Sequence, residues 1–143
     1  MFVSDILSQK GTSVFSVRST TSVADVARQL TERRIGSVLV LEADSRIAGI
    51  VSERDLVRAL AQFGAKAMEL ETRNVMTTEV ITCDPDDSID HVMETMTRGR
   101  FRHLPVVRHD QLLGLVSIGD VVKARLEETR HETEALKAYI VAS

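Results

Sequence analysis

The chain has 143 residues and a formal net charge of −3 at pH 7, with 43% apolar and 27% charged residues. A chain of this length buries about 70% of the surface of its unfolded form, so it needs neither a disulfide nor a metal ion to fold. The acidic balance argues against a nucleic-acid-binding protein, which needs a broad excess of Lys and Arg, and no segment reaches the ~20 apolar residues of a membrane span.

Residue usage also indicates the compartment and the core. Cys83 is the single cysteine, so no internal disulfide can form, as is usual in a reducing compartment. The N-terminal segment has neither the basic start nor the apolar run of a signal peptide. We therefore expect a cytoplasmic protein. With four Phe, one Tyr and no Trp, its core must be aliphatic.

The first half of the chain predicts the order β-α-β-β-α. A short apolar run, Val14–Val17, indicates a strand, and Ser22 is a suitable N-cap for a helix. That helix carries apolar residues at three- and four-residue spacing, namely Val23, Val26, Ala27 and Leu30. The runs Ser37–Leu41 and Ile47–Val51 predict a hairpin, and a second helix follows Ser52.

The second half predicts the same order. Val80–Cys83 indicates a strand, and Asp87 or Ser88 precedes a helix with apolar residues at Ile89, Val92, Met93 and Met96. His103–Val107 and Leu112–Val116 predict the second hairpin. Another helix follows this hairpin, and we expect it to continue through residues 127–140.

The two halves are copies of one βαββα unit. Val80 lies 66 positions after Val14, and Gly114 lies 65 positions after Gly49 because the second copy has one residue fewer in its hairpin turn. The nearly continuous apolar hairpin strands require cover on both faces. We therefore predict an α/β (α+β) fold in which the two copies pack sheet to sheet, with helices outside. The predicted divisions are a first repeat (1–63), a linker (64–79), a second repeat (80–126) and a C-terminal helical extension (127–143).

One motif occurs in both copies, as GIVSERD at 49–55 and GLVSIGD at 114–120. It places a serine where a strand gives way to a helix, and the free N–H groups of a helix start attract phosphate. The aspartate one turn later, Asp55 or Asp120, has two oxygens that can accept from both hydroxyls of a ribose. The motif suits a ribonucleotide.

A purely structural reading of the same motif is equally supported by the pattern. Ser-x-x-Asp before an apolar helix is close to a capping box, and losing such a cap costs about 1 kcal/mol whether or not a ligand binds. Duplication copies caps as faithfully as binding sites. The pattern alone leaves both readings open.

Basic residues gather near the predicted junctions. For Arg33, Arg34 and Arg98 we favour simple complementation of a helix C-terminal dipole. Arg54 lies at a helix start, where that explanation fails, so we assign it to ligand binding. Arg100 and Arg102 are two positions apart, which in an extended segment places both on one face, where they could clamp a phosphate.

No pattern indicates catalysis. The four histidines and Cys83 lack metal-ligand spacing, and no nucleophile–base pair is visible. We predict no metal site, no catalytic residue and no enzymatic activity.

The paired motifs, the FRHLPVV strand and the duplicated βαββα order resemble a tandem CBS-domain (cystathionine-β-synthase-type) module of the small stand-alone bacterial kind. This resemblance implies pseudo-two-fold symmetry and the binding of AMP, ADP, ATP or NAD(H) in clefts between the repeats. It also implies a homodimer and a regulated protein partner, with no role for nucleic acid or membrane. The alternatives are an enzyme, or the regulatory subunit of a separate one, and a structural or interaction domain with vestigial ligand sites.

The resemblance also implies roles for individual residues. Asp55 and Asp120 would hold ribose hydroxyls. Phosphate would be bound by Ser52, Arg54, Ser117, Arg100, Arg102 and His103. Adenine would be bordered by Lys10, Thr12, Val14, Ser37, Val38, Val80, Thr82, Leu104 and Pro105. The second motif has no counterpart of Arg54, so we expect the two sites to differ in affinity or ligand.

Overall fold

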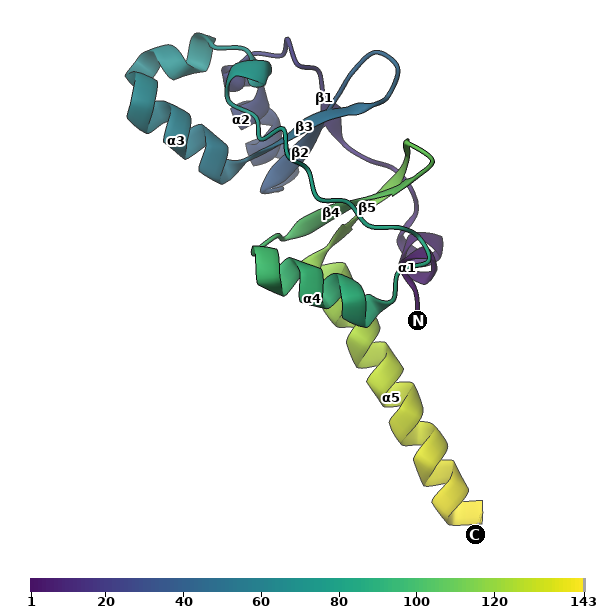
Figure 1. The fold of residues 1–143 in the computed structure, drawn as a ribbon. Helices are drawn as coiled ribbons and strands as arrows, with labels where there is room; N and C mark the ends of the chain where they lie inside the picture. The colour runs from purple at the N-terminus through teal and green to yellow at the C-terminus, as the bar shows by residue number, and fades with distance from the viewer. Residues whose placement is uncertain (143) are drawn as a thin grey trace. The chain divides into compact units, whose positions relative to one another are not determined.

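A computed structural model describes residues 1–142 and shows two compact units (Figure 1). We call residues 14–81, with the hairpin tip 110–112, the first-repeat unit. The second-repeat unit contains residues 1–13, residues 82–109 and the chain from Leu113 onward. The described residues form two small sheets and five α-helices, which confirms the predicted mixed α/β class.

The first-repeat unit follows the predicted order. Its elements are β1 (Ser16–Val17), α2 (Val23–Arg33), β2 (Ser37–Leu41), β3 (Ile47–Ser52) and α3 (Glu53–Phe63). Two short 3-10 helices follow, η1 (Gly64–Glu69) and η2 (Thr72–Asn74). The sheet has the order β1-β2-β3, with β1 parallel to β2 and β2 antiparallel to β3.

The second-repeat unit has the same order of elements, except that it begins with a helix where the first-repeat unit begins with a strand. It contains α1 (Val3–Lys10), α4 (Ile89–Gly99), β4 (His103–Arg108), most of β5 (Gln111–Ser117) and α5 (Ile118–Ala142). The expected C-terminal helix is therefore present as the second half of α5, whose residues are almost all exposed there.

Both cores are aliphatic, as composition predicts. In the first-repeat unit the buried residues are Val17, Val23, Val26, Leu30, Val38, Val40, Val51 and Leu56. In the second-repeat unit they are Val3, Ile6, Leu7, Cys83, Ile89, Val92, Met96, Leu104, Val106, Val116, Val121 and Ala124. Three consecutive residues are buried in the middle of both β2 and β4, which explains their continuous apolar sequences.

Each unit is completed by a segment that precedes the other repeat in the chain. Phe2, before α1, pairs with Ser88, the N-cap of α4. Glu71, in the segment between the repeats, pairs with Ser22, the N-cap of α2. Sequence reasoning missed α1, although Val3, Ile6 and Leu7 have helical spacing and are buried.

The predicted strand at Val80–Cys83 is wrong. Only Cys83 joins the second sheet, through a parallel bridge to Val106, and this matches the Val17–Val40 pair 66 positions earlier. Val80, Ile81 and Thr82 lie outside any strand, and Ile81 and Thr82 are exposed. The first strand is also shorter than expected, because only Ser16 and Val17 pair with β2.

Two glycines allow the segments that complete each unit, around Thr77 and in α1, to pack closely against the hairpins. A Cβ on Gly49 would lie 2.6 Å from the carbonyl oxygen of Thr77 and 2.8 Å from Sδ of Met76. At the equivalent Gly114, a Cβ would lie 2.7 Å from Cδ2 of Leu7. The first glycine of each copy of the motif, Gly49 or Gly114, is thus required by packing.

We predict that Gly49→Ala lowers the free energy of unfolding by about 1–3 kcal/mol, the usual cost of overpacking, measured by urea denaturation. Gly114→Ala should cost less, because the atom in its way is the end of a flexible leucine side chain.

Gly119→Ala is the matched control, because the nearest atom to its Cβ would be Ser117 Oγ at 3.6 Å and alanine favours the helix. Equal stability of Gly49→Ala and the wild type would contradict the close approach.

Candidate functional site

The repeated motif forms a reciprocal hydrogen-bonded cap at the start of α3 and of α5. In each copy the serine ends a strand, and the aspartate lies in the first turn of the helix. The carboxylate accepts from the backbone N–H of the serine, and the backbone N–H of the aspartate donates to the serine hydroxyl. The structural reading of the motif is therefore realised in both repeats.

In the first-repeat unit the carboxylate is enclosed. Oδ2 of Asp55 accepts from Ser52 N at 2.9 Å and from Ser52 Oγ at 3.1 Å. Oδ1 accepts from Thr77 Oγ1 at 3.1 Å and from Arg58 NH1 at 3.4 Å. The residue is only 5% exposed, so these donors take the place of the water that its carboxylate loses on burial.

In the second-repeat unit the carboxylate is more open. Oδ2 of Asp120 accepts from Ser117 N at 2.9 Å and from Lys10 Nζ at 2.6 Å. The same ammonium donates to the Leu115 carbonyl oxygen at 2.9 Å. The Asp120 side chain is 25% exposed.

Charges around Asp120 shift two pKa values. Burial alone would raise the pKa of Asp120, but the hydrogen bonds from Lys10 and Ser117 outweigh it and lower that pKa below its ordinary value. Burial and the nearby Lys10 and Arg102 lower the pKa of His103, although Asp120 opposes them. His103 is therefore neutral at pH 7 and is suited to donate a hydrogen bond rather than to act as a cation.

The predicted adenine-bordering residues are divided between the units. Ser37, Val38, Val14 and Val80 lie in the first-repeat unit, where Ser37 pairs with Ser52 across β2 and β3. Lys10, Thr12, Thr82, Leu104 and Pro105 lie in the second-repeat unit. Leu104 and Pro105 are buried, whereas Thr12 and Thr82 are exposed.

The arginines occupy different settings. Arg54 is exposed in the first turn of α3. Arg102 leads into β4, and its carbonyl oxygen accepts from Ile118 N at 2.8 Å, which places it beside the start of α5. The expectation that Arg100 and Arg102 share one face of an extended segment is wrong, because Arg100 has left-handed backbone angles at the C-cap of α4.

Cys83 is buried in the core of the second-repeat unit. Burial, together with Asp87 and Asp84, raises the pKa of the Cys83 thiol to about 12, so it is protonated and unreactive. Across residues 1–142, no group of three or more His, Cys, Asp or Glu side chains is placed to hold a metal ion. No helix in that range is long and apolar enough to cross a membrane.

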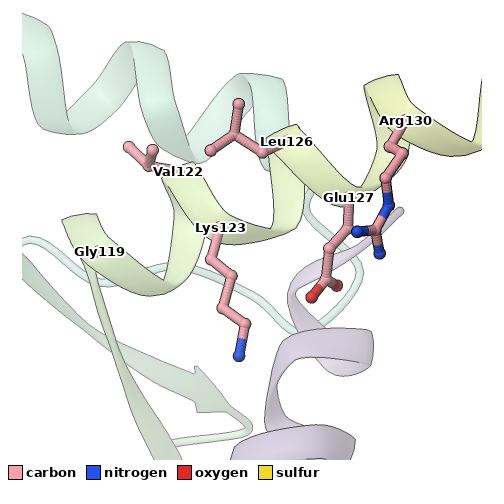
Figure 2. A pocket seen from close by; sticks show the side chains of 6 residues that line it. All are labelled: Gly119, Val122, Lys123, Leu126, Glu127 and Arg130. Atoms are coloured by element: carbon pink, nitrogen blue, oxygen red, sulfur yellow. The ribbon is translucent and has the colours of Figure 1, made fainter. Parts of the chain in front are cut away.

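A surface hollow lies along α5, beyond the capped carboxylate (Figure 2). Its apolar part is formed by Val122 and Leu126, which are 43% and 66% exposed. Its other lining residues are Gly119, Lys123, Glu127 and Arg130. Along this face of α5 the apolar side chains, Val122 and Leu126, lie on one side, and the side chains of Lys123 and Glu127 lie on the other (Figure 2).

The fold and the duplicated capped carboxylates define a CBS-domain pair. The family model for the CBS domain matches residues 3–62 and 73–127, and the chain belongs to this family. It is 33% identical over 146 residues to the mitochondrial CBS domain-containing protein CBSX3 of Arabidopsis thaliana, covering 96% of this chain and 71% of the relative.

Solved structures agree with this assignment. The CBS-domain containing protein ATU1752 from Agrobacterium tumefaciens is 44% identical, with a TM-score of 0.82 over 87% of this chain and 92% of that one. CBSX2, solved in complex with AMP, is 25% identical, with a TM-score of 0.76 over 90% and 98%. The CBS pair of MJ0100, solved with 5′-methylthioadenosine and S-adenosyl-L-methionine, has the same identity, TM-score and coverage.

Sequence reasoning missed three contacts of the carboxylates. Thr77 and Arg58 bind Asp55, and the side chain of Lys10 binds Asp120. Arg58 could have been found, because it lies one helical turn after Asp55. Lys10 and Thr77 come from segments outside the βαββα pattern. That pattern does not indicate that these segments contact the carboxylates.

We predict that Asp120→Asn reduces the acid sensitivity of the fold. The pKa of Asp120 is lower in the folded state than its ordinary value of 3.8. Its stabilising contribution is therefore complete above about pH 4 and is lost as the pH falls through the folded-state pKa. Unfolding in urea at pH 7, 4 and 3 should show a steeper loss for the wild type, and equal slopes would contradict the ion pair.

Proposed function

We propose that this chain is a non-catalytic regulatory module that binds adenine nucleotides (AMP, ADP, ATP or NAD(H)) at sites built around Asp55 and Asp120. It would act in the cytoplasm and signal energy or redox state to a protein partner. The observation that carries this proposal is the duplicated, capped Ser-x-x-Asp at a strand–helix junction. Relatives of the same family have been solved with AMP or with S-adenosyl-L-methionine and 5′-methylthioadenosine.

The chemistry of the site supports a nucleotide. A carboxylate fixed by backbone N–H groups can accept hydrogen bonds from a ribose diol, and hydrogen bonds to a charged group are worth about 1.5–3 kcal/mol each. Arg54 beside Asp55, and Arg102 with His103 in the second-repeat unit, would bind phosphate. Arg100 would contribute to phosphate binding from the C-cap of α4 and not from an extended strand.

A second candidate is a structural domain with vestigial sites, and the geometry of Asp55 favours it for the first repeat. Both oxygens of Asp55 already accept hydrogen bonds, and the residue is nearly fully buried. A ligand there would have to displace Thr77 or Arg58. The experiment below separates this candidate from the nucleotide module.

We expect AMP, ATP or NAD(H) to raise the melting temperature of the wild type. Ligand at 100 times its dissociation constant adds about 2.7 kcal/mol, which for this chain length is a shift of several degrees. Asp55→Ala and Asp120→Ala should each lower the melting temperature and reduce that shift.

Ser22→Ala is the control for the loss of a helix cap, because the Ser22 hydroxyl caps α2 by accepting from Asp25 N, outside the motif. It should lower the melting temperature and keep the full ligand response. If the aspartate variants behave like Ser22→Ala, the carboxylates are caps only. If the isolated chain turns the nucleotides over, it is an enzyme and not a sensor.

The homodimer is part of the proposal and is supported by the hollow along α5. Val122 and Leu126 offer an exposed apolar stripe there, and Val57, the counterpart of Val122 in α3, is 64% exposed. A second copy of the chain would bury these residues.

We predict that Leu126→Asp shifts the chain from dimer to monomer in sedimentation-velocity experiments, because a carboxylate cannot be buried unpaired at an apolar interface. Val141→Asp, near the end of α5 and outside the hollow, should leave the dimer intact. A wild type that is already monomeric at high micromolar concentration would contradict the dimer.

A further inference from the structure

Lys10 and Thr77 hold equivalent acceptors in the two units. In the first-repeat unit, Thr77 donates its backbone N–H to the carbonyl of Ile50 at 2.9 Å and its hydroxyl to Asp55 Oδ1. Leu115 and Asp120 lie 65 positions after Ile50 and Asp55. In the second-repeat unit, one group, the ammonium of Lys10, donates to the Leu115 carbonyl oxygen and also to the Asp120 carboxylate.

This exchange changes the charge beside the carboxylate. Thr77 is neutral, whereas Lys10 forms an ion pair with Asp120 at 2.6 Å. Asp55 forms an ion pair with Arg58 at 3.4 Å, and the Arg58 side chain is 65% exposed, so solvent screens much of its charge. The carboxylate of the second repeat is therefore neutralised at close range, and that of the first is mainly hydrogen-bonded by uncharged groups.

The exchange also leaves part of Asp120 available. Among the described residues, the hydrogen bonds to its carboxylate end on Oδ2, whereas Asp55 uses both of its oxygens. With a side chain that is 25% exposed, Asp120 can accept a ribose hydroxyl at Oδ1 without losing Lys10. The second repeat is therefore the better prepared of the two sites.

We infer that Lys10 is a specificity-determining residue of the second-repeat site, where its ammonium neutralises Asp120 and makes the site prefer a phosphorylated nucleotide to the neutral nucleoside. This inference rests on the proposed function. Asp120 binds the diol that both ligands share, and a carboxylate without its counter-charge repels a phosphate nearby. Lys10 removes that repulsion while Arg102 and His103 bind the phosphate.

The test compares AMP with adenosine by isothermal titration calorimetry. Titrations use the Asp55→Asn protein, in which the first site has lost its carboxylate charge, with and without Lys10→Met. We expect Lys10→Met to weaken AMP about tenfold and adenosine less than about twofold. Lys10→Arg, which keeps the charge, should retain most of the preference for AMP.

Lys66→Met is the matched control, because it makes the same change at an exposed position of η1 in the other unit, and it should alter neither affinity. Equal weakening of AMP and adenosine by Lys10→Met would show that Lys10 only holds α1 in place, and this would overturn the inference. No change for either ligand would overturn it as well.

A ligand-free measurement separates this inference from the proposed function. NMR titration of the Asp120 carboxyl should give a higher pKa in Lys10→Met than in the wild type, because the favourable ion pair is lost. An unchanged pKa would overturn the inference even if AMP binds. If the pKa rises but the wild type binds neither AMP nor adenosine, both the proposed function and the selectivity assigned to Lys10 are overturned.

Discussion

The structure depends on how the polypeptide fixes a negative charge at each strand–helix junction. A carboxylate that is 5% exposed, as in Asp55, is stable only if donors replace the water that it loses. The backbone N–H of the serine supplies part of this at Asp55 and Asp120 alike. Each carboxylate also accepts from one side chain outside the βαββα pattern, Thr77 at Asp55 and Lys10 at Asp120. The cap, the packing of those two segments and the proposed ligand binding therefore all use the same carboxylate oxygens.

Shared atoms explain why capping and ligand binding are not exclusive readings of the motif. A cap uses the carboxylate lone pairs that face the helix start, and a ligand needs those that remain. Asp120 keeps an oxygen without a protein donor among the described residues, whereas Asp55 does not. Duplication copied the cap faithfully, and the two copies then diverged in what covers them.

The repeated elements could be predicted from the sequence, because apolar spacing reports which residues face a core. Helices α2 and α4, both hairpins and the start of α5 lie where the spacing of apolar residues such as Val23 and Val92 predicts them. The pairing of α1 with the second repeat could not be predicted, because periodicity shows that Leu7 is buried but not which strand it contacts. Lys10 was expected near the adenine, and its ion pair became visible only in three dimensions.

The placement of α1 and of the segment around Glu71 has a consequence for dissecting the molecule. A fragment of residues 80–126 would lack Val3, Ile6 and Leu7, which fill its core. Cutting the chain before residue 80 therefore leaves the second half without part of its core, whereas the first half keeps Glu71 and Thr77, which pair with its own residues. A stand-alone second-repeat unit would have to be rebuilt so that α1 is joined to the second repeat and no longer to the first.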